Sequence, residues 1–280
     1  IKKAHQRGLK LHAWVNTFEA RDSSPGSLSR KHPEWICRNK DNVPMPEKFT
    51  LSPGLIAVRN YLHRVILEIV KNYQVDGIHL DYVRWSEYPI DKSNDFNESI
   101  VGQFIFDKNH SYSSNIPEGF KNWGDWRRDQ VTQFVKDLNT LMKKVKPEVL
   151  LSAAVIGKYN WGKWNGYYSV FQDSALWHNK NYLDQLMTMS YYQETKDELE
   201  HHLYLGGKKS WEHWLLKSDA KLSVGIGSLM LREQGLWDNH PELILTTRKK
   251  DWISGVQFFS YRDWLIKDYF TEISKDIFKK

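Results

Sequence analysis

Short apolar stretches recur along the chain, and six of them have the length and period of β-strands. In the first, Leu9–Asn16, apolar side chains at positions 9, 11, 13 and 15 form one face. The other five lie at 75–82, 149–156, within 183–192, at 221–228 and at 255–261. Because these strands are far apart in the sequence, the segments between them decide the fold.

Apolar residues at helical spacing fill most of those intervals. We expect a helix from Ser52, as N-cap with Pro53 in its first turn, to about residue 73, and another over 126–146. Residues 197–217 are predicted to be mostly helical with a break at Gly206-Gly207, and helices are also expected over 241–250 and after 261.

Strands that alternate with helices predict a parallel sheet with right-handed crossovers. Six such units make most of a (β/α)8 TIM barrel, an α/β fold with its functional groups at the carboxyl ends of the strands. We therefore expect one domain over 1–280, N-terminally incomplete, because two units and the start of a helix would precede Ile1. The alternative, an open doubly wound sheet, lacks its glycine-rich phosphate loop, since Gly225-Ile226-Gly227 alone is a weak signal.

Composition narrows the function. Aromatic residues make up 14% of the chain, with 13 Trp against 5 Met, which suits stacking on sugar rings as well as an indole-rich core. One cysteine excludes an internal disulfide, and the net charge of +6 is too small and scattered to suggest nucleic acid. No apolar run is long enough to span a membrane. We expect a monomer that binds an oligo- or polysaccharide and needs no cofactor.

Asp81 is the leading catalytic candidate, because it ends an apolar strand where a barrel keeps its active site. His79 shares its face through the period of two, and Arg84 offers either a sugar contact or a plain salt bridge to Asp81. Asp76 begins the strand and is expected at the opposite end. A metal site of His12, His79 and Asp81 is disfavoured by its spacing, so none is predicted.

Hydrolysis of a sugar polymer requires a second carboxylate. Glu194 is our first choice, followed by Asp263, Asp173 and Glu87. Further substrate-binding candidates at strand ends are Asn16, Tyr191, Tyr261 and Asp263. The proposed stacking platforms are Trp14, Trp85, Trp161, Trp164 and Trp264, whereas Trp126 and Trp252 are expected to be packing residues.

Several segments resemble one known family in order along the chain. They are GLKLHAWVN at 8–16, HPEW at 32–35, LSPG at 51–54, YQVDGIHLDYVRW at 73–85, and the later WRR at 126–128, MSY at 189–191 and GVQFFSY at 255–261. The resemblance is to the family-ten glycosyl-hydrolase-like (glycosyl hydrolase-like 10) proteins of bacteria. It implies a TIM barrel whose third to eighth strands are visible, and an action on bacterial glycans such as peptidoglycan strands. It also implies a secreted, periplasmic or cell-surface protein.

The sequence departs from the family pattern after the first, second and fourth visible strands, where Asn16-Thr17-Phe18, Arg84-Trp85-Ser86 and Met189-Ser190-Tyr191 stand. These changes leave the sugar preference open. A family-18 chitinase is disfavoured, because Val83 occupies the position of its acid. Two hypotheses remain: a glycoside hydrolase acting through Asp81 and Glu194, and a carbohydrate-binding barrel without catalysis.

Overall fold

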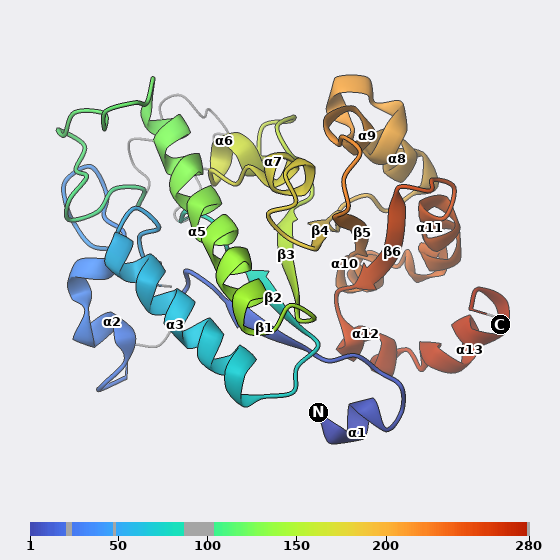
Figure 1. The fold of residues 1–280 in the computed structure, drawn as a ribbon. Coiled ribbons are helices and arrows are strands. Elements are labelled where there is room, and N and C mark those ends of the chain that lie inside the picture. Colours follow the sequence, from blue (N-terminus) through green and yellow to red (C-terminus); the bar gives the residue numbers. More distant parts are fainter. Residues whose placement is uncertain (21–23, 47–48, 87–103, 279–280) are drawn as a thin grey trace.

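The computed structural model describes residues 1–20, 24–46, 49–86 and 104–278 (Figure 1). Its centre is one parallel sheet of six strands in the order β1-β2-β3-β4-β5-β6. The strands are β1 (His12–Asn16), β2 (Gly77–Asp81), β3 (Leu150–Ile156), β4 (Gln185–Met189), β5 (Lys221–Ile226) and β6 (Ile253–Phe258). The predicted α/β class, with consecutive strands adjacent as in a (β/α) barrel, is confirmed.

Helices connect the strands. α1 (Lys2–His5) precedes β1. Between β1 and β2 lie α2 (Leu28–Lys31), the 3-10 turn Pro33–Trp35 and α3 (Ile56–Asn72), and α5 (Trp123–Val145) leads to β3. Next come α6 (Gly166–Ser169), α7 (Ser174–Asn179), α8 (Lys196–Glu200), which runs into a π-helical turn His201–Leu205, and α9 (Trp211–Trp214). The last are α10 (Ser228–Glu233), α11 (His240–Thr247), α12 (Tyr261–Ile266) and α13 (Tyr269–Asp276). In Figure 1, α3 and α5 run together over the β1–β3 side.

Two helices begin elsewhere than predicted. The helix expected from Ser52 starts at Ile56, because the Ser52 hydroxyl donates to the buried carboxylate of Asp107 (2.6 Å) instead of capping the helix. The helix expected from residue 126 starts at Trp123, where the side chain of Asn122 accepts the backbone N–H of Asp125 (2.8 Å). The region 197–217 is mostly helical with an interruption at Gly206, as predicted, and its pieces after the interruption are short turns.

The two faces of the sheet differ in chemistry. The face against the helices is apolar and fully buried, through Ile78, Leu80, Leu151, Val155, Leu186, Leu222 and Val224. On the other face the register aligns polar groups of neighbouring strands. His79 Nδ1 lies 3.0 Å from Ser152 Oγ, and the Gln185 amide donates to Ser223 Oγ (2.6 Å).

Within the described ranges, no helix combines the length and apolarity that crossing a bilayer demands.

The N-terminal end of β2 is fixed by Asp76, whose carboxylate accepts the backbone N–H of Leu11 (2.7 Å) and contacts His5 Nε2 (2.9 Å). Asp76 therefore lies at the end of the strand opposite Asp81, as the sequence predicted.

Candidate active site

A cavity of about 300 Å³ lies at the carboxyl ends of the strands on the polar face. It is bordered by the first strand and the last, since both Trp14 of β1 and Gln257 of β6 line it, so the sheet curls around it. We call it the central cavity, and its lining residues are Trp14, His79, Asp81, Tyr82, Arg84, Ala154, Met189, Tyr191, Gln257, Phe258 and Phe259.

Asp81 is the carboxylate of the central cavity. Its Oδ1 accepts the backbone N–H of Tyr82 (2.7 Å) and lies 3.8 Å from Arg84 Nη1, and the side chain is 13% exposed. Tyr82 is held at φ 48°, in the left-handed region that costs a non-glycine residue about 1–2 kcal/mol. This strained turn brings Arg84 back over the Tyr82 ring at 4.4 Å and toward the carboxylate, which suggests that the turn is kept for function.

Two neighbours of Asp81, His79 and Tyr191, are half-buried. Burial lowers the pKa of His79 below its usual value, although the nearby charge of Asp81 acts in the opposite direction. Burial also raises the pKa of the Tyr191 phenol, and the charge of Asp81 adds to that shift. The Tyr191 ring stacks on Phe259 at 5.2 Å, so the phenol is fixed between β4 and β6 as a neutral hydrogen-bonding group.

The central cavity continues into two others across the ends of β3 and β4. The middle cavity, about 440 Å³, shares Tyr82, Arg84, Met189 and Tyr191 with it and adds Trp164 and Tyr192. The outer cavity, about 640 Å³, shares Lys158, Tyr192 and Gln193 with the middle one and ends at α8. We call the three together the groove. Shared walls make it continuous, which is the shape that a chain of sugar units fits.

Comparisons with known proteins agree with this geometry. Residues 1–232 match the model of the family described as glycosyl hydrolase-like 10. The chain belongs to that family. Its relatives include the glycosyl hydrolase YngK of Bacillus subtilis (30% identical over 164 residues) and the glycosyl hydrolase DigH of Escherichia coli (26% over 172 residues). Each match covers 56% of this chain but only 29% and 35% of the relative, so the chain spans about a third of the length of these proteins.

Solved structures show the same fold at low sequence identity. The glycoside hydrolase domain of PgaB (BpsB) from Bordetella bronchiseptica has a TM-score of 0.59 at 9% identity, over 98% of this chain and 76% of that one. The alpha-L-fucosidase isoenzyme 2 of Paenibacillus thiaminolyticus has a TM-score of 0.53 at 13% identity, over 98% of this chain and 38% of that one. This glycosyl hydrolase-like 10 chain therefore has the fold of a partial (β/α) barrel, with six parallel strands in the described residues.

The structure brings several predicted site residues together. Asp81, His79, Arg84 and Tyr191 all line the central cavity, and Asn16 is aligned with Asp81 on the neighbouring strand with an exposed side chain. Among the predicted platforms, Trp14 (62% exposed) borders the central cavity and Trp164 the middle one. Trp161 reaches the outer cavity but is only 9% exposed and packs on Trp211 at 5.8 Å, so most of its ring belongs to the core.

Two predicted platforms are core residues instead. Trp85 is 1% exposed, and its indole N–H donates to the backbone carbonyl of Arg127 (3.0 Å). Trp264 is 5% exposed and donates to Ser228 Oγ (2.9 Å). Neither indole has a face left for a sugar ring, which corrects that expectation. Trp126 is buried as predicted.

The proposed second carboxylates lie outside the groove or outside the described residues. Glu194 accepts a hydrogen bond from the Gln234 amide beyond α10, and it does not line any of the three cavities. Asp263 is buried, caps α12 through Ser260 and pairs with Arg232 (3.0 Å). Asp173 accepts the Tyr159 hydroxyl (2.7 Å), and burial raises the pKa of its carboxyl. Glu87 lies outside the described residues.

Tyr261 also lies away from the groove. Its side chain is 66% exposed, and the ring packs 5.4 Å from that of Phe270 on α13. Sequence reasoning in turn missed Gln257, Tyr82 and Tyr192. Gln257 could have been found as the one polar side chain of the apolar run from Val256 to Phe259, since a polar residue there must face the concave side.

Metal ligands are not grouped in the described part of the chain, where no cluster of three or more His, Cys, Asp or Glu is arranged to hold an ion. His12 packs over Gly77, so that an added Cβ there would lie 2.5 Å from the imidazole. The polar and aromatic groups that line the groove are carboxylates, a guanidinium, imidazoles, amines, phenols, amides and indoles.

Gly225 makes room for two residues of the site. An added Cβ would lie 2.5 Å from the Thr188 carbonyl oxygen, 2.9 Å from Gln257 Nε2 and 3.0 Å from Tyr191 Cε1. We expect Gly225→Ala to lower the free energy of unfolding by about 1–3 kcal/mol, because the backbone of β4 must shift. Urea denaturation measures this, with Gly255→Ala as the control, since its Cβ would meet only Ser223 Oγ at 3.3 Å. Equal losses in the two variants would contradict the close-approach argument.

Proposed function

We propose that this domain is a glycoside hydrolase that cleaves O-glycosidic bonds of a polysaccharide, with the glycan strands of bacterial peptidoglycan or a similar polymer as substrate. The observation that carries the proposal is Asp81. Among the described residues, it is the one Asp or Glu that lines the central cavity, at a strand end, and no described Asp or Glu lines the middle cavity. Family membership supports hydrolase chemistry, and the continuous groove supports a polymer rather than a single sugar.

The neighbours of Asp81 suit the role of the ionised carboxylate among the two carboxyl groups of a glycosidase. A guanidinium 3.8 Å away balances the charge of a carboxylate, which favours the nucleophile or the stabiliser of an oxocarbenium-like transition state over the proton donor. Arg84, Tyr191 and Asn16 are proposed to hold sugar hydroxyls, and Trp14 and Trp164 to stack on rings. The test is incubation of the chain with peptidoglycan strands, chitin oligomers and plant glycans, with product mass spectra. An absence of new reducing ends on every glycan would contradict the proposal.

A non-catalytic carbohydrate-binding role is the second candidate. Hydrolysis by the usual mechanisms needs two carboxylates at the scissile bond. Among the described residues, the candidates Glu194, Asp173 and Asp263 bond to other groups and do not line the central cavity beside Asp81, which favours a binding role. Glycan binding without any cleavage would support this second function.

A cell-surface, periplasmic or extracellular location is proposed for either role. It is supported by an S-layer-related protein of Niallia circulans that is 22% identical, in a match that covers 74% of this chain and 16% of that protein.

Tyr192 offers a test of the groove. Its side chain is 70% exposed and lines both the middle and the outer cavity, so its removal leaves the core intact. We expect Tyr192→Ala to raise KM for a long glycan about 3–10-fold with little change in kcat, the loss of one stacking contact. Tyr112→Ala is the control, because that exposed tyrosine packs on Phe106 away from the groove. A KM unchanged in Tyr192→Ala would exclude the middle cavity from substrate binding.

A further inference from the structure

A fourth cavity lies at the other end of the sheet. It has a volume of about 390 Å³ and is lined by Lys221, the first residue of β5, and by Ser254 at the start of β6. Because all strands are parallel, this is the amino end of the sheet, whereas Asp81 and Tyr191 are at the carboxyl end. The cavity is therefore separate from the groove, with which it shares no lining residue.

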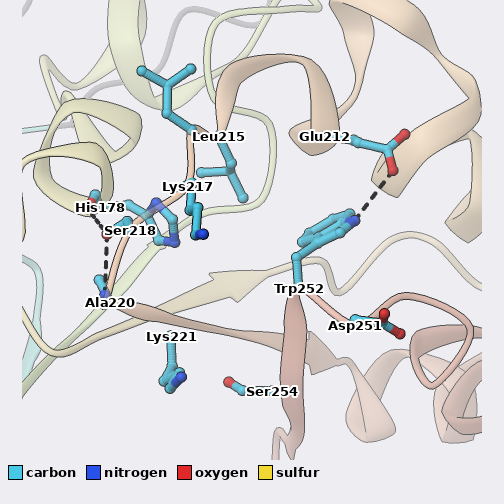
Figure 2. Close-up of a pocket in the computed structure, with 11 residues that line it drawn as sticks. His178, Glu212, Leu215, Lys217, Ser218, Ala220, Lys221, Asp251, Trp252 and Ser254 are labelled. Atoms are coloured by element: carbon cyan, nitrogen blue, oxygen red, sulfur yellow. Dashed lines mark hydrogen bonds between the residues drawn. The ribbon is translucent and has the colours of Figure 1, made fainter.

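An indole forms one wall of this cavity. Figure 2 shows Trp252 projecting from the segment before β6, opposite the segment that carries Leu215 and Ser218. The indole N–H donates to Glu212 Oε1 (3.2 Å), and the same carboxylate oxygen accepts Lys250 Nζ (2.9 Å). These bonds fix the ring at its polar edge, so the ring is oriented before any ligand arrives. Trp252 is half-buried and packs against the hydrophobic core, as the sequence predicted, and it also borders this cavity.

The opposite wall is held by a network centred on Asn181. This residue adopts φ 54°, and its Oδ1 accepts the Ser218 hydroxyl (2.7 Å) and the backbone N–H groups of Asp219 (3.1 Å) and Ala220 (3.0 Å). The same hydroxyl lies 2.6 Å from the His178 carbonyl oxygen, its alternative acceptor, at the left of Figure 2. A left-handed asparagine that organises a loop in this way builds a rigid wall, which reduces the entropy cost of binding.

The lining combines one aromatic ring and leucine side chains with groups of both charges. Leu216 is 66% exposed, and Lys217 and Lys221 supply donors where Glu212 and Asp251 supply acceptors. Sugar rings present an apolar face for stacking and hydroxyls that both donate and accept, so they use all of these groups at once. A volume near the lower end of ligand sites fits one or two rings rather than a long segment.

We propose that this cavity binds sugar units of the same polysaccharide at a second, non-catalytic site. The identity of the ligand as a glycan rests on the proposed function, whereas the existence of the site rests on the wall geometry described above. A second anchor at the opposite end of the domain would keep the protein on its polymer between cleavage events and raise the effective concentration of substrate.

The test is NMR of the tryptophan indole N–H signals, in an Asp81→Asn background so that the added glycan stays intact. Trp252→Phe assigns the Trp252 signal, and soluble chitin oligomers and peptidoglycan-derived oligosaccharides are titrated in. We expect the Trp252 signal to move in a saturable way. Leu216→Asp, a change at an exposed position, should weaken this binding at least about fivefold, because it puts a charge on the apolar wall.

The outcomes separate the two proposals. Movement of the Trp14 and Trp164 signals without that of Trp252 would overturn the second site and leave the groove in place. Movement of Trp252 alone would support the second site and count against a glycan in the groove. If the Trp252 signal moved with the same glycan affinity in Leu216→Asp as in the unchanged lining, the second site would also be overturned. If no tryptophan signal moved on glycan addition, both proposals would be contradicted.

Discussion

Asp81→Asn is expected to lower turnover of the cleaved glycan by at least ~10³-fold while glycan binding stays within about threefold of the unchanged chain. Asn keeps the shape of Asp and can still accept the Tyr82 N–H, so the strained turn at the strand end is retained. It loses the negative charge that the Arg84 guanidinium faces and that the oxocarbenium-like transition state needs. The measurement is the rate of new reducing ends at saturating glycan, together with calorimetric binding.

Asp76→Asn is the matched control for this prediction. The residue is of the same type and directly precedes the same strand, but it lies at the amino end and contacts Leu11 and His5 rather than facing the central cavity. Turnover should be unchanged in this control within about twofold. If Asp81→Asn turned over as fast as Asp76→Asn does, Asp81 would be a structural partner of Arg84 and the carbohydrate-binding role would become the better interpretation.

The strands and the position of Asp81 could be predicted because both depend on local pattern. Alternation with a period of two assigns His79 and Asp81 to one face and Ile78 and Leu80 to the other, and the structure confirms this division. A short apolar segment with a helix before and after it is typical of a strand in a parallel sheet. In such a sheet all carboxyl ends lie at one edge, so the position of Asp81 at the end of its segment predicts the edge at which it lies.

The roles of the indoles could not be predicted, because burial of a tryptophan depends on partners far along the chain. Trp85 and Trp14 both stand near strand ends, yet Trp85 donates to Arg127, 42 residues away, and is buried, whereas Trp14 is exposed on the first strand. The same limit applies to Glu194, whose contact with Gln234 spans 40 residues. Local spacing contains no information on such contacts.

The start of α3 shows the same competition at a helix end. Ser52-Pro53 has the local pattern of an N-cap, but the Ser52 hydroxyl is drawn to Asp107, 55 residues away, and also accepts the Gly54 N–H (3.1 Å). An unpaired buried charge costs several kcal/mol of folding free energy, whereas the loss of a helix cap costs about 1 kcal/mol. The hydrogen bond from Ser52 to Asp107 is therefore the more stabilising use of this hydroxyl. The helix therefore begins three residues after the turn, at Ile56.

The stability of the chain is expected to fall steeply in acid, and His202 is the residue with the clearest contribution. Burial, with smaller effects from the charges of Lys158 and His201, lowers the pKa of His202 from 6.5 to about 3. Between these two pH values the unfolded state binds a proton that the folded state excludes. The stability that this histidine contributes is thus complete above pH 6.5 and is lost as the pH falls toward 3.

His202→Gln should remove that part of the pH dependence. Below pH 6.5 one excluded proton makes the free energy of unfolding fall by about 1.4 kcal/mol per pH unit, so about 2 kcal/mol is lost by pH 5. Gln cannot titrate and can still bond Ser190 Oγ, which lies 2.9 Å from His202 Nε2. Urea denaturation at pH 7, 6 and 5 should give a slope smaller by about one proton than in the unchanged chain. The exposed His213 provides the control, since His213→Gln should leave the slope unaltered, and equal slopes in all three proteins would show that His202 is not excluded from protonation in the fold.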